Sequence, residues 1–151
     1  MKQNMRISLI LVLYLVLIGL PHVSYSDSGT PSNPQLELAK NTFNAALSCS
    51  KDYKQRKKQS IECLQSYAAM RSKTKQKKLA HWLSIMQLIS INQCNSTELQ
   101  LVKRRSQRIP NIPHIFVCAH YYQKPFQKTA MVTIGQTDSE LNWKIIAVME
   151  L

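Results

Sequence analysis

Three side chains of one short segment have the types and spacing that a metal site needs. His114, Cys118 and His120 lie in a stretch rich in β-branched and aromatic residues, and an even spacing puts them on one face of a strand. Two imidazoles and one thiolate are ligands that zinc accepts. Cysteines of exported proteins more often form disulfides, and strand histidines more often pack or face water. Because the chain begins with an export-like segment, Cys118 is expected in a disulfide and the sequence predicts no metal. It also predicts no cofactor.

The alternative of a small secreted nuclease-like hydrolase would use the same two histidines and a lysine as acid, base and charge stabiliser. No opposing partner for them can be identified, and the carboxylates are too scattered to form an acid–base pair. The chain has three glycines and no clustered run of them, which argues against a phosphate-binding loop. The sequence therefore leaves the catalytic residues unknown and favours a non-catalytic protein.

Basic residues are the other chemically distinctive group, and they occur in three runs along the chain. If the runs converge in the fold, they form one anion-binding surface. Its predicted members are Lys54, Arg56, Lys57, Lys58, Lys75, Lys77, Lys78, Lys103, Arg104, Arg105 and Arg108. Runs of this kind also occur as plain solvated faces, which is the alternative interpretation.

The first 26 residues determine the compartment in which this charge must act. Lys2 and Arg6 precede an apolar run over residues 7–20, and Pro21 breaks that run ahead of small residues at 24 and 26, a pattern typical of a signal peptide. At about 1.5 Å per residue the run is roughly 21 Å long, short for a bilayer span. An uncleaved signal anchor remains the alternative. We expect export to the periplasm or secretion.

Removal of residues 1–26 takes away two of the 20 basic residues and none of the eight acidic ones, which leaves a net charge of +10. Such a chain is attracted to an anionic surface or an acidic protein. A specific nucleic-acid partner is not expected, because aromatic residues do not interleave with the basic runs. An immunity or secretion-system component that binds an acidic partner is the corresponding interaction-protein alternative.

Four cysteines in an exported chain predict two disulfides. Three pairings exist, and we favour Cys49 with Cys63 and Cys94 with Cys118, because each closes a short loop between elements expected to be neighbours. On the chain-entropy account each adds about 3 kcal/mol.

Periodicity predicts the elements that position these residues. Residues 27–35 are expected to be a flexible leader, and 36–151 a single domain. Apolar residues at helical spacing predict three helices, over 36–49, from about 61 to 70, and from 79 to a point before Asn95. Alternation predicts strands over 114–122, 128–137 and 142–150, and a weaker strand over 98–104. The predicted fold is α+β, with three N-terminal helices packed on a curved antiparallel sheet in a cone-like arrangement.

Helices followed by a strand meander that ends in Leu-Asn-Trp-Lys-Ile-Ile-Ala at 141–147 resemble the nuclear transport factor 2-like (cystatin-like) superfamily. The basic helix approach at 77–82, the Arg104-Arg105 region, the segment 110–113 before a strand and the Trp143 strand are similar to small exported bacterial proteins of a domain-of-unknown-function family. The resemblance implies a sheet that wraps a helical layer, and the fold alone transmits no function.

Two further partners are expected from this architecture. An apolar small ligand would occupy the cone, which is otherwise filled by its own side chains, and a homodimer would form through the sheet. The cone is expected to be lined by Ile115, Val117, Val132, Ile134 and Ile145. The sequence thus predicts an exported, basic, non-catalytic binding or accessory protein.

Overall fold

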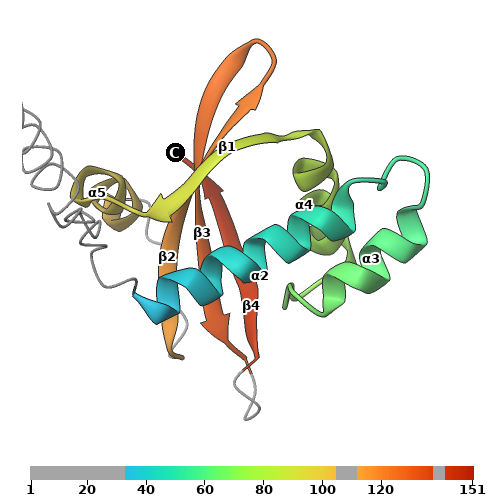
Figure 1. Cartoon of the computed structure of the whole chain (residues 1–151), viewed down its shortest axis with the longest axis horizontal. Helices are drawn as coiled ribbons and strands as arrows, with labels where there is room; N and C mark the ends of the chain where they lie inside the picture. The colour runs from blue at the N-terminus through green and yellow to red at the C-terminus, as the bar shows by residue number, and fades with distance from the viewer. Residues whose placement is uncertain (1–32, 105–111, 138–141) are drawn as a thin grey trace, which may run out of the picture. The chain divides into compact units, whose positions relative to one another are not determined.

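The computed structural model describes residues 33–104, 112–137 and 142–151. The predicted signal peptide lies outside these residues, as do residues 27–32 of the leader and two predicted patch members, Arg105 and Arg108. Within the described ranges, no helix is long and apolar enough to cross a membrane. The described chain is α+β, with four helices and a curved four-stranded antiparallel sheet (Figure 1).

Along the chain, three helices are followed by a strand, a fourth helix and three further strands. Their bounds, in chain order, are α2 Pro34–Ser50, α3 Lys57–Gln65, α4 Lys73–Ile85, β1 Gln87–Gln93, α5 Ser96–Arg104, β2 His114–Gln123, β3 Phe126–Gln136 and β4 Trp143–Glu150.

Helix α2 begins within the predicted leader. The Asn33 side chain accepts a hydrogen bond from the N–H of Gln35 at 3.0 Å, and Pro34 follows at the first helical position, where its missing N–H costs nothing. The prediction of a leader up to residue 35 is therefore wrong for its last two residues, because this capping pair starts the helix earlier.

Helix α3 ends earlier than expected. Instead of continuing to residue 70, the chain leaves the helix at Gln65 and pairs with the edge of the sheet through a parallel bridge between Ala68 and Ile145. Helix α4 likewise stops at Ile85, and the segment predicted as its last turns is strand β1. Tertiary pairing with β2 and β4 thus overrides the helical spacing of these residues.

The strand predicted over 98–104 is a helix, α5. Its first turn is a reciprocal capping box: the Asn95 side chain accepts the N–H of Glu98 at 2.9 Å, and the Glu98 carboxylate accepts the N–H of Asn95 at 2.8 Å. The apparent alternation of Leu99 and Leu101 indicated the two-residue period of a strand, whereas the segment is helical.

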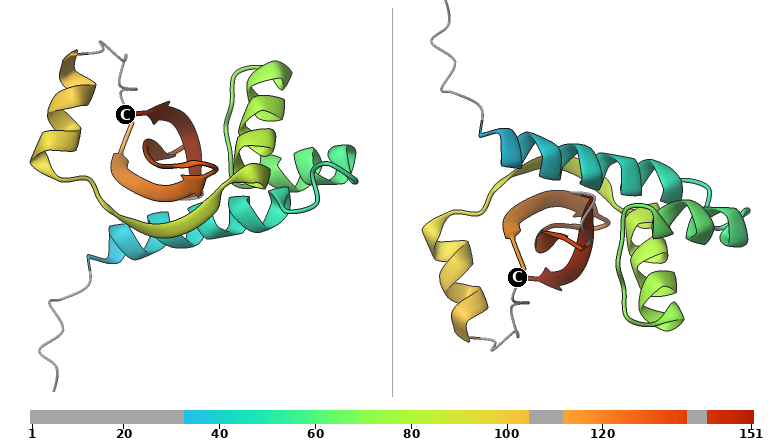
Figure 2. Two further views of the ribbon diagram at one scale, coloured as in Figure 1. Left: turned by 90° about the horizontal axis from the view of Figure 1, so that it is seen from above. Right: turned by 90° about the horizontal axis from the view of Figure 1, so that it is seen from below.

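The sheet has the order β1-β2-β3-β4, with every neighbouring pair antiparallel. The predicted meander of the last three strands is confirmed, and β1 adds a fourth strand beside β2. Figure 2 shows the sheet curled when viewed along its strands, with α4 and α5 on opposite sides of it.

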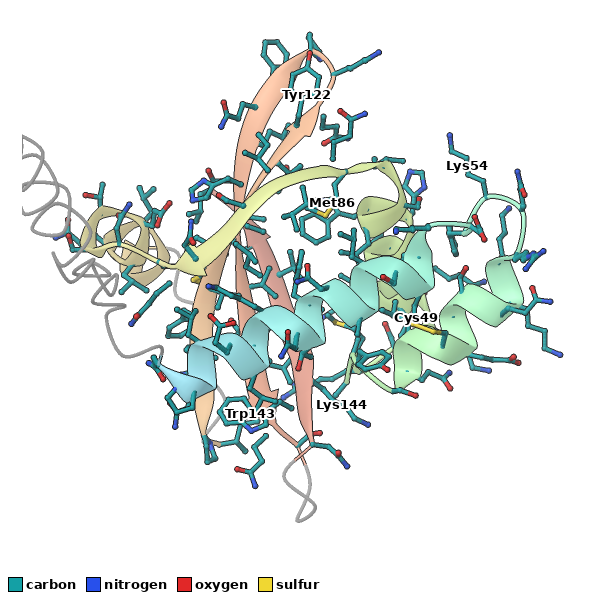
Figure 3. All side chains as sticks on the ribbon, viewed as in Figure 1. Cys49, Lys54, Met86, Tyr122, Trp143 and Lys144 are labelled. Carbon is teal, nitrogen blue, oxygen red and sulfur yellow. A yellow bond between two sulfur atoms is a disulfide. The ribbon has the colours of Figure 1, made fainter. Side chains whose placement is uncertain are left out.

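The two sheet faces bury different residues, as the alternation of β2 predicts. One face contacts α2 and contributes to a large apolar core that includes Val117, Tyr121 and Phe43. The other face holds a small cluster around the Cys94–Cys118 disulfide with Met131. Both predicted disulfides are present: Cys49–Cys63 joins α2 to α3, with Cα atoms 5.5 Å apart, and Cys94–Cys118 joins the end of β1 to β2, with Cα atoms 4.9 Å apart (Figure 3).

Candidate anion-binding site

The first two basic runs meet in a pocket between α3 and α4. The pocket has a volume of about 510 Å³. Lys57 and Lys58 come from the start of α3, and Lys73 and Lys77 from the start of α4. We refer to this hollow as the lysine pocket. Its remaining lining residues are Tyr53, Ile61, Glu62, Gln65 and Gln76. Two helix faces therefore contribute four exposed lysine side chains to the lining of one hollow.

Helical spacing explains the local arrangement. Ile61 lies four positions beyond Lys57, Glu62 lies four beyond Lys58, and Gln65 follows one further turn along the helix, so they share one face of α3 with the two lysines. Lys73 and Lys77 are also four positions apart on α4. Buried Tyr53 lies behind the pocket, with its ring centroid 6.3 Å from that of His81.

The electrostatics of the lysine pocket are strongly one-sided. Four lysines face one carboxylate, Glu62, which gives the lining a formal net charge of +3. Lys58 Nζ lies 3.9 Å from Glu62 Oε1, but both side chains are mostly exposed, so this pair contributes little. Neither helix has an acidic residue in its first turn, where the helix dipole favours one. The lysines at the starts of α3 and α4 therefore repel one another and the positive ends of the helix dipoles. A bound anion would reduce this repulsion.

The structure divides the rest of the predicted patch. Lys54 and Arg56 lie exposed in the connection before α3, between the lining residues Tyr53 and Lys57 in sequence, and Figure 3 labels Lys54 there. Lys75 and Lys78 lie on the other flank of α4 and line a second pocket beside β4. Of the third basic run, the structure describes positions 103 and 104, which are not brought to this region because their helix, α5, lies on the opposite side of the sheet from α4 (Figure 2).

Sequence reasoning missed one member of the lysine pocket, Lys73, although it lies in the run 71–78. The spacing of Lys73 and Lys77, a full helical turn apart, was the signal that could have identified it. The contribution of Tyr53 had no such signal, because the residue precedes α3 and reaches the pocket only through the turn after α2.

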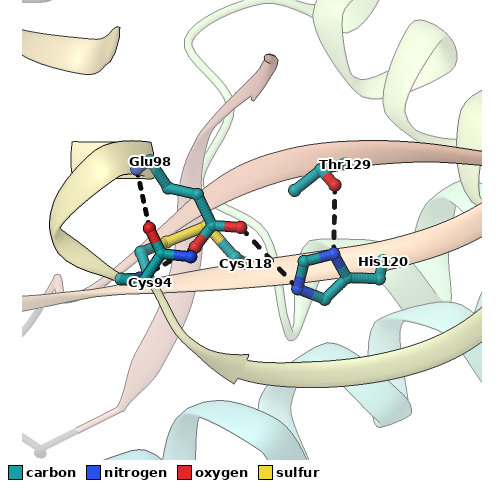
Figure 4. Close-up of a disulfide and its surroundings, with 6 residues drawn as sticks. Cys94, Glu98, Cys118, His120 and Thr129 are labelled. Atoms are coloured by element: carbon teal, nitrogen blue, oxygen red, sulfur yellow. Dashed lines mark hydrogen bonds and ion pairs between the residues drawn. A yellow bond between two sulfur atoms is a disulfide. The ribbon is translucent and has the colours of Figure 1, made fainter. Parts of the chain in front are cut away.

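The three side chains considered as zinc ligands, His114, Cys118 and His120, make other contacts. Cys118 is in a disulfide, and Nδ1 of His114 lies 2.7 Å from the carbonyl oxygen of Ile112. His120 is held from both sides: Nδ1 lies 3.0 Å from Thr129 Oγ1, and Nε2 lies 3.7 Å from Glu98 Oε1 (Figure 4). A thiolate from Cys118 is therefore not available to a metal while the disulfide is intact.

The geometry also separates the two histidines of the nuclease alternative. His114 and His120 lie six residues apart on the same strand, which at about 3.4 Å per residue places them roughly 20 Å apart. An acid and a base at that separation cannot act on the same bond. His114 instead packs edge-on against Phe116, with ring centroids 5.0 Å apart.

The cone residues expected to line an apolar ligand site are part of the packed core. Ile115, Val117, Val132, Ile134 and Ile145 are each at most 9% exposed and belong to one apolar cluster with residues of α2 to α4. This favours the alternative stated for them, that the space is filled by the protein's own side chains.

One buried hydroxyl connects the core to the second pocket. Tyr121 Oη donates to Glu150 Oε1 at 2.7 Å and accepts from Trp82 Nε1 at 3.3 Å, and Lys128 Nζ lies 3.6 Å from Glu150 Oε2. Burial, and the hydrogen bond to Glu150, raise the pKa of Tyr121 to about 12. The hydroxyl is therefore a fixed donor at neutral pH.

No family model, curated protein or solved structure matches this chain.

Proposed function

We propose that this chain is an exported, non-catalytic protein that binds an acidic protein partner through the lysine pocket. The observation that carries the proposal is the convergence of Lys57, Lys58, Lys73 and Lys77, from two separate basic runs, on one hollow of about 510 Å³. Convergence distinguishes this site from a solvated basic face, since lysines that only keep a protein soluble have no reason to share a pocket.

The shape of the site favours a protein over a lipid surface. A concave pocket can receive a projecting carboxylate side chain, and Tyr53, Ile61 and the two glutamines offer apolar and hydrogen-bonding contacts around it. Lys54 and Arg56 extend the positive charge along the adjoining connection. Charge complementarity of this kind raises the association rate and selects acidic partners.

The proposed compartment has two supports. The N-terminal sequence has the order of a signal peptide, and two disulfides are compatible with an oxidising environment. The resemblance to the nuclear transport factor 2-like superfamily is likewise a proposal. It is supported by a curved antiparallel sheet with a helix lying across one face.

The test is a binding titration with polyglutamate at several salt concentrations. The variant K57E/K77E places two negative charges in the pocket, and K124E/K144E changes the net charge equally at positions outside it. We expect the pocket variant to lose about tenfold or more in affinity and the control variant about twofold or less, with wild-type affinity falling as salt increases. Equal losses in both variants would reduce the attraction to net charge alone and contradict the proposal.

A further inference from the structure

Among the residues that the structure describes, no strand pairs with the outer edge of β4 beyond Ile145. β4 is the last strand in the sheet order, and its one described outward partner is the segment before α4. There, the N–H of Ile145 donates to the carbonyl of Tyr67 at 2.8 Å, and the N–H of Ala69 donates to the carbonyl of Ile145 at 2.9 Å. After Ile145 this segment leaves the edge and leads into α4.

Register shows which backbone groups point outward beyond that contact. The N–H of Leu151 donates to the carbonyl of Thr129 on β3 at 3.0 Å, so residue 151 hydrogen-bonds inward. Inward and outward residues alternate along a strand, which directs the N–H and C=O of Val148 away from β3. This edge has already accepted one parallel segment, at Ile145.

A groove runs along the same edge. It has a volume of about 540 Å³, and it lies between β4 and α4, which stand side by side in both views of Figure 2. Met70, Leu79 and Trp82 form an apolar wall, and the β4 residues 146–148 form the other side. An open strand edge beside an apolar groove is the geometry used by domains that bind peptides by strand addition.

The charge of the groove indicates what kind of peptide it would take. Lys75 and Lys78 are exposed at its α4 rim. The Glu150 carboxylate, at the β4 side, accepts a hydrogen bond from Tyr121 and lies 3.6 Å from Lys128. Lys128 offsets part of this charge, and with Lys75, Lys78 and Glu150 the groove lining has a formal net charge of +1.

From the open edge, the apolar wall and the two rim lysines we infer that this groove binds an extended acidic peptide segment, which adds to β4 as a fifth strand. Backbone hydrogen bonds to the outward groups of β4 supply affinity, alternate apolar side chains enter the groove, and carboxylates reach Lys75 and Lys78. The site is distinct from the lysine pocket on the other flank of α4, and the inference does not depend on that proposal.

A second copy of the chain fits the edge less well. Two copies that pair their β4 edges about a two-fold axis present the same patch to each other, which brings the Lys75 and Lys78 rims of both together. Like charges across such a contact are destabilising. The charge of the groove therefore favours an acidic strand over a copy of this basic one.

The experiment uses a capped hexapeptide of alternating glutamate and valine, and two derivatives of the same charge. One derivative is N-methylated at every valine and the other at every glutamate. Only alternate N–H groups of an added strand face β4, so we expect one derivative to lose binding and the other to retain it. Equal affinities of the two derivatives would overturn strand addition, because attraction by charge alone does not distinguish them.

Matched charge variants locate the site. We expect K75E/K78E to weaken peptide binding about tenfold or more and K73E/K77E, on the other flank of the same helix, to change it about twofold or less. The reverse order would overturn the inference, and it would leave the lysine pocket proposal standing. Circular dichroism of each variant checks folding, and K75Q/K78Q provides a milder replacement with the same expected direction.

Two additional measurements exclude the other occupants. Dodecanoate should not displace the peptide, and light scattering should give a monomer mass. Displacement by dodecanoate would assign the groove to a small amphipathic acid, and a dimer that dissociates on peptide addition would assign the edge to a second copy. Either result would overturn the inference.

Discussion

The two faces of the sheet achieve burial by different means. The face under α2 buries a large apolar cluster in which Phe43, Ala46 and Val117 are fully inaccessible. Among the described residues the opposite face buries far less: Met131 and the Cys94–Cys118 disulfide form its centre, with a few partly buried neighbours. The first face can be stabilised by the hydrophobic effect alone, whereas the second replaces missing apolar area with a covalent bond.

This difference affects where on the protein a binding site can change without loss of stability. The helix-covered face holds the scaffold, and both lysine-bearing pockets lie on flanks of α4, at the margin of that core. Substitutions of the exposed lysines should therefore leave stability nearly unchanged, since surface changes of this kind are usually worth less than about 0.5 kcal/mol.

The largest expected effect is on the apolar face. Phe43 is 0% exposed and meets Trp82 edge-on, with ring centroids 6.3 Å apart. F43A should lower the free energy of unfolding by about 3–5 kcal/mol, because it removes a large buried ring and leaves a cavity. Denaturant unfolding of F43A and wild type measures this loss. The matched variant on the other face is F116A, where the partly buried ring packs on the disulfide cluster. Similar losses for both would contradict the contrast between the faces.

The disulfides should show the next largest effect. C94A/C118A opens a loop with a sequence separation of 24 and C49A/C63A one of 14, and the chain-entropy account gives about 3 kcal/mol for each, slightly more for the longer loop. Cys118 is fully buried, whereas Cys63 is exposed, so the first pair also loses packing. Unfolding of each variant against wild type checks the order. A larger loss for C49A/C63A would show that the second face does not depend on its covalent bond.

The sequence predicted the parts of this fold that follow from local periodicity. Strict alternation in β2 correctly assigned Val117 to one face and Cys118 to the other, because a strand has a side-chain period of two. Where two periods compete, prediction failed: Ile89 and Ile91 fit both the end of a helix and a strand, and pairing with β2 decides for the strand. Helix α5 was missed although its Asn95-to-Glu98 capping box is legible in the sequence.

The candidate sites depend on information that the sequence does not hold locally. Three basic runs were visible, but their convergence depends on how α3 packs against α4, a tertiary contact across the connection 66–72. Position 104 was predicted to join the same basic surface, but its helix, α5, lies across the sheet from α4, whose residues line both pockets. The groove beside β4 required the sheet order, which decides that β4 is an edge.

The smallest expected effect is the pH dependence of stability that comes from Tyr121, whose hydroxyl lies on the apolar face. The pKa of Tyr121 is raised from its ordinary value of 10.0 to about 12 by burial and by its hydrogen bond to Glu150. Between about pH 10 and 12 the unfolded chain loses this proton while the folded chain keeps it, so linkage makes wild-type stability fall as pH rises through that window. In Y121F this contribution is absent.

We therefore expect Y121F to be less stable than wild type below pH 10, by about 1 kcal/mol, because Trp82 Nε1 and Glu150 lose their shared partner. The gap should close and then reverse toward pH 12, because a rise of about two pKa units is worth about 2–3 kcal/mol of wild-type stability, which is lost across that window. Urea unfolding of both proteins from pH 8 to 12 measures it, and Y122F, at a partly exposed tyrosine on the other face of β2, is the matched control. A constant gap across that range would show that the Tyr121 hydroxyl ionises as readily in the folded chain as in the unfolded one, and the helix-covered face would then be apolar in its energetics throughout.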